Sequence, residues 1–111
     1  MRSSLSPVGF GDYVQALIET TSLGPVAISR HVIRFFAREQ ADGDETIATN
    51  KAIESLQSTE LEKLTTPMPS QGLEFWIHRS SSLVFTVLLE DGYKVVSMVV
   101  KADMSNFIFD S

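Results

Sequence analysis

Cysteine is absent from this chain of 111 residues, and histidine occurs only twice. The sequence therefore has no disulfide framework, no thiol nucleophile and no cysteine zinc site, and it has too few histidines for a histidine-rich metal site. Its 6 glycines form neither a GxGxxG loop nor a P-loop. We therefore expect no metal site, no cofactor and no catalytic residue, and we interpret the protein as a non-enzyme.

Long apolar runs are also lacking. No stretch of the sequence approaches the roughly 20 apolar residues that a membrane-spanning helix needs. The first residues, MRSSLSPVGFG, lack the apolar stretch of about 7 to 15 residues that characterises a secretory signal. We therefore expect a cytoplasmic protein without a membrane partner, and we interpret residues 1–10 as a loose lead into the fold.

Positive charge is scarce. The formal net charge is −5, and the middle of the chain is the acidic part, since residues 39–65 hold seven acidic residues against Lys51 and Lys63. A basic surface is the usual electrostatic footprint of a nucleic-acid-binding protein. The overall charge therefore argues against nucleic acid as the principal partner.

The residues that are present fit one globular domain over 1–111, with 43% apolar and 21% charged residues. Apolar residues recur at helical spacing over residues 11–65 and alternate, or run continuously, among β-branched and aromatic residues over 73–101. TTPMPSQG, residues 65–72, separates these halves, because two prolines and a glycine stop a helix. Residues 102–111 follow as a C-terminal segment.

Three helices are predicted in the first half. One covers residues 12–21, with Asp12 as its N-cap, and a second runs from Pro25 to about Ala41. A third begins at DGDE, where Asp42 and Glu45 have capping-box spacing, and ends near residue 57. A kink or a separate short turn is expected to follow, carrying Leu61 and Leu64.

The second half predicts a three-stranded antiparallel meander. In LVFTVLLEDGYKVVSMVV, residues 83–100, the Asp-Gly pair predicts a type I′ hairpin that places Glu90 opposite Tyr93 and Val87 opposite Val96. LEFWIHR, from residue 73, is the preceding strand. If SSS is a three-residue connection, Ile77 lies opposite Phe85. One face is then uniformly apolar, formed by Leu73, Phe75, Ile77, Leu83, Phe85, Val87, Leu89, Val96, Met98 and Val100. We expect the helices to cover this face, giving an α+β domain of three helices packed on a three-stranded meander.

The other face of the predicted meander is more apolar than a solvated face should be. It suggests a non-catalytic protein-binding module, such as an adaptor, an inhibitor or a small subunit, which binds a partner protein or a second copy. Two alternatives stay open: the C-terminal NFIFD, or a helix, folds across this face, or the strand register differs from the predicted one. The predicted partner-binding residues are Trp76, His78, Val84, Leu88, Tyr93, Val95 and Val99.

A different function is implied by SLGPVAISRHV, residues 22–32. Its Ala27, Ile28, Ser29 and Arg30 resemble the turn and the start of the second helix in helix-turn-helix DNA-binding proteins. The resemblance implies a DNA-binding regulator in which Val26, Ser29 and Arg30 read bases, and Arg34 and Arg38 lie near phosphates. Arg30, Arg34 and Arg38 recur every four residues and form a basic ridge on the predicted helix. This arginine ridge can equally pair with the acidic segment that follows it, or simply contact solvent. The implied nucleic-acid-binding residues are Val26, Ser29, Arg30, Arg34 and Arg38.

Overall fold

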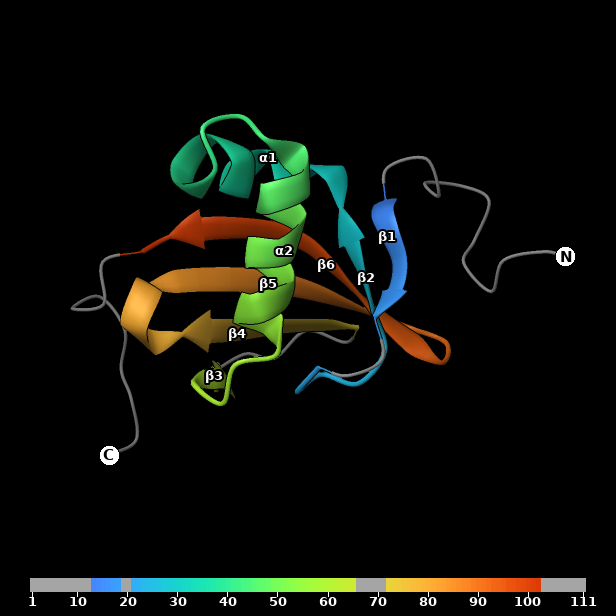
Figure 1. Cartoon of the computed structure of the whole chain (residues 1–111). Helices are drawn as coiled ribbons and strands as arrows, with labels where there is room; N and C mark the ends of the chain where they lie inside the picture. The colour runs from blue at the N-terminus through green and yellow to red at the C-terminus, as the bar shows by residue number, and fades with distance from the viewer. Residues whose placement is uncertain (1–12, 19–20, 66–71, 103–111) are drawn as a thin grey trace, which may run out of the picture.

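A computed structural model describes residues 13–18, 21–65 and 72–102. Its element order is β1 (Tyr13–Ile18), β2 (Val26–Ser29), α1 (Arg30–Gln40), α2 (Glu45–Leu56), β3 (Leu61–Lys63), β4 (Leu73–His78), the 3₁₀ turn η2 (Arg79–Ser81), β5 (Leu83–Glu90) and β6 (Tyr93–Lys101). The strands form one sheet in the order β1-β2-β6-β5-β4-β3 (Figure 1). β2 and β6 run parallel, and the other neighbouring strands are antiparallel.

This architecture corrects the predicted one. The α+β class is confirmed, but the described residues form two helices on a six-stranded mixed sheet, not three helices on a three-stranded meander. The meander itself is present as β4, β5 and β6, and strands from the first half of the chain extend it on both sides. The prediction that residues 1–111 form a single domain stays a prediction, and the lead 1–10 and most of the C-terminal segment lie outside the described residues.

The first predicted helix is wrong, because residues 13–18 form β1, which pairs with β2. The second predicted helix begins too early: residues 26–29 are β2, a central strand between β1 and β6. The side chains of Val26, Ala27 and Ile28 are fully buried. A short apolar run buried on both faces fits a strand as well as a helix, and here pairing with neighbouring strands decides the outcome.

The two helices begin at side-chain caps. The Ser29 hydroxyl accepts a hydrogen bond from the Val32 N–H and opens α1, and the Asp44 carboxylate accepts from the N–H groups of Thr46 and Ile47 and opens α2. The third predicted helix is thus confirmed as α2, with its cap at Asp44 where the prediction placed it at residue 42. The buried residues of α2 are Ala48, Ala52 and Leu56, one stripe at four-residue spacing.

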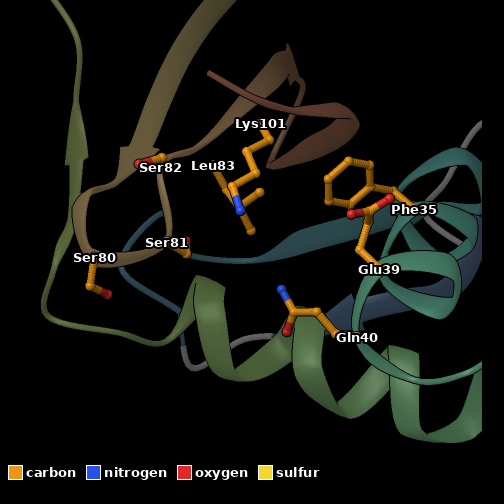
Figure 2. Close-up of a pocket in the computed structure, with 8 residues that line it drawn as sticks. All are labelled: Phe35, Glu39, Gln40, Ser80, Ser81, Ser82, Leu83 and Lys101. Atoms are coloured by element: carbon orange, nitrogen blue, oxygen red, sulfur yellow. The ribbon is translucent and has the colours of Figure 1, made fainter. Parts of the chain in front are cut away.

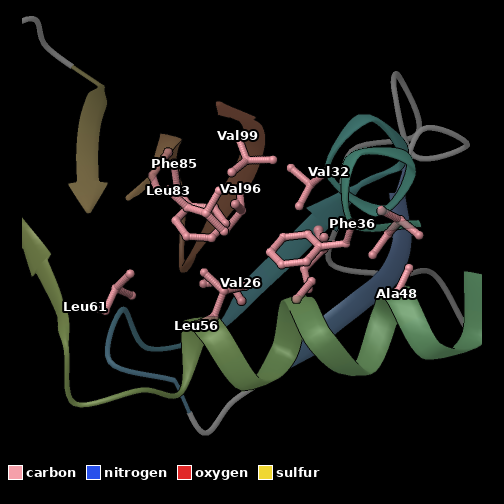
Figure 3. Close-up of a cluster of buried hydrophobic side chains, with 14 of the residues drawn as sticks. Val26, Val32, Phe36, Ala48, Leu56, Leu61, Leu83, Phe85, Val96 and Val99 are labelled. Atoms are coloured by element: carbon pink, nitrogen blue, oxygen red, sulfur yellow. The ribbon is translucent and has the colours of Figure 1, made fainter. Parts of the chain in front are cut away.

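Both helices pack on the same face of the sheet, which we name the helix face. Figure 3 shows Phe85, Val96 and Val99 of the sheet pointing toward Val32 and Phe36 of α1. The rings of Phe36 and Phe85 stack with centroids 6.3 Å apart and an interplanar angle of 13°. The main core therefore lies between the helices and the middle of the sheet. No helix in the described part of the chain is long and apolar enough to cross a membrane, and the compartment stays a prediction.

The register between β4 and β5 differs from the prediction by one residue. His78, not Arg79, lies opposite Leu83, and Trp76 therefore lies opposite Phe85. The cause is the connection, which uses four residues: the turn η2 and Ser82, whose φ is +60°. Because side chains alternate along a strand, this slip places Trp76 on the helix face and Ile77 on the opposite face.

The register between β5 and β6 agrees with the prediction near the turn and then departs from it. Glu90 pairs with Tyr93 and Val87 with Val96, but Thr86 pairs with Met98, so that Ser97 is an extra residue in β6. This β-bulge reverses the alternation beyond it. The predicted helix-face positions of Met98 and Val100 are therefore wrong. The turn also differs from type I′: φ is +87° at Gly92, and among described non-glycine residues only Asp42 and Ser82 have positive φ.

The segment after α2 is β3, where a kink or a separate short turn had been expected. It is an edge strand of three residues that pairs with β4, with Leu61 opposite His78 and Lys63 opposite Trp76. Leu61 is buried in the main core, whereas Glu62 and Lys63 are exposed. β3 thus closes the main core at one edge of the sheet and leaves charged side chains there in solvent.

Candidate functional site

The side of the sheet away from the helices, which we name the second face, is mostly apolar. Ala27 and Val95 form a small buried cluster there, with Leu88 and Tyr93 packed against it. Neither of the two described helices lies on this face. Alternation along the strands from these residues adds Leu73, Phe75, Ile77, Val84, Met98 and Val100.

Exposure is uneven across the second face. Val95 and Ile77 are almost completely buried, whereas Met98 and Val100 have exposed fractions of 46% and 50%. These two are among the few large apolar side chains in the described residues that are exposed to this extent. Since they lie two residues apart on the same strand, they form one continuous apolar strip about 7 Å long. The strip is the part of the second face that remains available for contact.

The predicted partner-binding residues do not lie together. Val84, Leu88, Tyr93 and Val95 are on the second face, as predicted, whereas Trp76, His78 and Val99 are on the helix face. The slip at η2 moves the first two of these, and the bulge at residue 97 moves Val99. Met98 and Val100 take the place that the prediction gave to Val99. The polar Ser97, which interrupts the apolar run of residues 95–100, is the signal that could have indicated the bulge.

Trp76 belongs to a polar network at the margin of the helix face. Its indole N–H donates to the Glu74 carboxylate at 3.0 Å, and the same carboxylate pairs with Lys63 and Lys94 at 3.1 Å each. The Lys94 ammonium group also lies 5.5 Å from the centroid of the Trp76 ring. Burial alone would raise the pKa of Glu74, but the hydrogen bonds from Trp76, Lys63 and Lys94 outweigh it and lower the pKa from 4.5 to about 2.

The network links three strands of the sheet, since Lys63 is on β3, Glu74 on β4 and Lys94 on β6. The Glu74 carboxylate is hydrogen-bonded to Trp76 and paired with two lysines, and these contacts stabilise its ionised form. Such a carboxylate is a poor general base, because its low pKa leaves it little affinity for a proton. We therefore interpret this network as a structural clamp and not as a reaction centre.

The close partner of His78 is a serine of the adjoining turn. The Nδ1 atom of His78 lies 2.7 Å from the hydroxyl oxygen of Ser81, across the turn η2. Arg79, in the same turn, forms an ion pair with Glu62 of β3. These contacts fix the connection between β4 and β5. In the described part of the chain, no three His, Asp or Glu side chains are grouped so that they could hold a metal ion.

The helix-turn-helix geometry implied by the resemblance is not found. Residues 13–18 and 26–29, which would belong to its two helices, are strands β1 and β2. Val26 and Ser29, two of the three implied base-reading residues, are buried. Arg34 and Arg38 are exposed on α1, and Arg38 pairs with Glu39 at 3.2 Å. The resemblance thus loses its structural basis, and the arginine ridge does not support a DNA-binding function.

No protein-family model, no curated protein and no solved structure matches this chain.

Proposed function

We propose that the protein is a non-catalytic protein-binding module that uses the second face of its sheet. The observation that carries the proposal is the exposed strip of Met98 and Val100, which continues an apolar sheet face that neither described helix covers. A sheet face in contact with water normally alternates with polar side chains, and contiguous exposed apolar surface usually marks an interaction site. The partner is another protein or a second copy of this chain.

The proposed partner-binding site therefore differs in some residues from the one predicted from the sequence. Leu88 and Tyr93, which are half-buried on the same face and pack against Val95, remain in it, and Met98 and Val100 are added. Trp76, His78 and Val99 leave it because their side chains are on the helix face. Edge-to-edge binding at β3 has less support, since β3 is a short edge strand with exposed charged side chains at Glu62 and Lys63.

The test replaces the strip with polar side chains of similar size, in the double variant Met98→Gln/Val100→Thr. Sedimentation equilibrium over about 1 to 200 μM measures self-association, and retention of proteins from extract on the immobilised chain measures partner binding. Loss of about 1 kcal/mol of apolar burial per residue predicts association weakened by roughly tenfold or more. Circular dichroism should show an unchanged fold.

The matched control is Ile47→Gln, because Ile47 is an apolar side chain of α2 with a similar exposed fraction of 45%. It should leave association unchanged. If the wild-type chain is monomeric throughout and binds no protein that the double variant fails to bind, the second face is not an interface. Equal loss in both variants would mean that general apolar exposure, and not this strip, drives the association.

A further inference from the structure

A cavity of about 260 Å³ lies between the end of α1 and the connection from β4 to β5 (Figure 2). Phe35, Glu39 and Gln40 line it from α1, Ser81 from η2, and Lys101 from the end of β6. Three segments that are far apart in the sequence thus contribute polar groups to one space. Its volume is just below the roughly 300 to 1,000 Å³ of most ligand pockets, which restricts an occupant to a small molecule.

The cavity contains opposite charges that do not neutralise each other. Lys101 forms no ion pair with Glu39 or with any other residue among 13–18, 21–65 and 72–102. Figure 2 shows its ammonium group and the amide of Gln40 pointing toward the same space. The Glu39 carboxylate has Arg38 as its partner, but both side chains of that pair are largely exposed, with fractions of 68% and 45%. Such surface pairs are weak and yield to a better-placed cation.

The Ser81 hydroxyl is engaged with His78. Its oxygen lies 2.7 Å from Nδ1 of His78 and 3.4 Å from the carbonyl oxygen of His78. Either tautomer of the imidazole leaves the hydroxyl proton directed toward His78, onto Nδ1 or onto the carbonyl oxygen. The Ser81 hydroxyl therefore belongs to the wall of the cavity, and the charges that can contact an occupant are those of Lys101 and Glu39.

We propose that this cavity binds the ammonium and carboxylate groups of a free amino acid. Lys101 and the Gln40 amide hold the carboxylate, and Glu39 holds the ammonium group. A phosphate or a dicarboxylate would be repelled by Glu39, and a metal cation would be repelled by Lys101. A zwitterion is the small ligand that satisfies both charges. This site is separate from the second face and does not depend on its function.

The experiment titrates the full chain with L-alanine and follows the amide NMR signals of residues 39–40, 80–82 and 101. Saturable shifts at these positions are expected in the millimolar range. Acetate and ethylammonium, each carrying one of the two charged groups, should bind at least about tenfold more weakly, because each makes only one of the two charge-assisted contacts.

Two variants, Lys101→Gln and Glu39→Gln, test the assigned contacts. Each should weaken L-alanine binding by about tenfold, since a charged hydrogen-bond partner is replaced by a neutral one. Lys51→Gln and Glu54→Gln, both at exposed positions of α2, should leave binding unchanged. The proposal is overturned if L-alanine causes no saturable shifts up to about 50 mM, or if inorganic phosphate binds as well and binds more tightly to Glu39→Gln, which would make the cavity an anion site.

Discussion

Trp76 of β4 lies directly opposite Phe85 of β5, and both side chains are on the helix face of the sheet. Phe85 is fully buried in the main core, and the half-buried Trp76 packs against that core. The indole also holds the Glu74 carboxylate through its N–H group. The only tryptophan of the chain is therefore a structural residue that joins the core to the clamp of Glu74.

Replacement of Trp76 by alanine should lower the free energy of unfolding by about 2 to 3 kcal/mol, because it removes a large packed side chain and one hydrogen bond to a carboxylate. Urea denaturation followed by circular dichroism measures the change. Trp76→Phe keeps an aromatic ring but loses the N–H group, and it should cost roughly half as much. A Trp76→Ala protein of unchanged stability would show that this side chain does not belong to the core.

Stability should depend on pH through Glu74. Its pKa in the folded protein, about 2, lies below its ordinary value of 4.5. The stabilisation is therefore fully present above about pH 4.5 and is lost as the pH falls toward 2. Because Lys63 and Lys94 are 56% and 27% exposed, solvent screens part of the effect. We expect about 1 to 3 kcal/mol to be lost over this range.

The comparison that isolates this contribution uses Glu74→Gln, whose unfolding free energy should be lower at pH 6 and should fall less between pH 5 and pH 2. Glu54→Gln, at an exposed position of α2, should behave like the wild type. Urea denaturation at a series of pH values provides the data. Identical pH profiles for Glu74→Gln and the wild type would rule out the clamp as a source of acid sensitivity.

Local signals predicted the elements that depend on local chemistry. The Asp91-Gly92 pair predicted the β5–β6 hairpin and the pairing of Glu90 with Tyr93, and the acidic cap near residue 44 predicted α2. The strands β4, β5 and β6 were also predicted, because apolar and β-branched residues dominate them. These features require no knowledge of distant parts of the chain.

The errors lie where distant parts of the chain decide the structure. β1 and β2 were predicted as helical because a short apolar run fits a helix as well as a strand. What makes β2 a strand is its pairing with β6, more than 60 residues later, and this pairing leaves no signal in the local sequence. The faces of β4 depend on whether the connection has three or four residues, which three successive serines do not reveal. The predicted partner-binding residues depended on both the local hairpin and the length of the connection. Leu88 and Val95 are therefore on the predicted face, whereas Trp76 is on the helix face.

The bulge in β6 is hydrogen-bonded to Ser29 of β2. The Ser29 hydroxyl donates to the carbonyl oxygen of Ser97 at 2.7 Å and also accepts from the Val32 N–H at the start of α1. Replacement of Ser29 by alanine leaves a half-buried carbonyl group and a helix N-terminus without this partner, and should lower the unfolding free energy by about 2 kcal/mol. Asp44→Ala, which removes only the exposed cap of α2, should cost about 1 kcal/mol.

Ser97→Ala is the companion variant, because the Ser97 hydroxyl makes one half-buried hydrogen bond, to the carbonyl oxygen of Thr86 at 3.2 Å, and does not hold the bulge to β2. It should therefore cost less than Ser29→Ala in urea denaturation. The bulge places Met98 and Val100 on the second face, so its loosening should also weaken association through that strip. If Ser29→Ala costs no more than Ser97→Ala, the bulge is fixed by the packing of β5 and β6 alone, and the exposed strip does not depend on the hydrogen bond from Ser29 to Ser97.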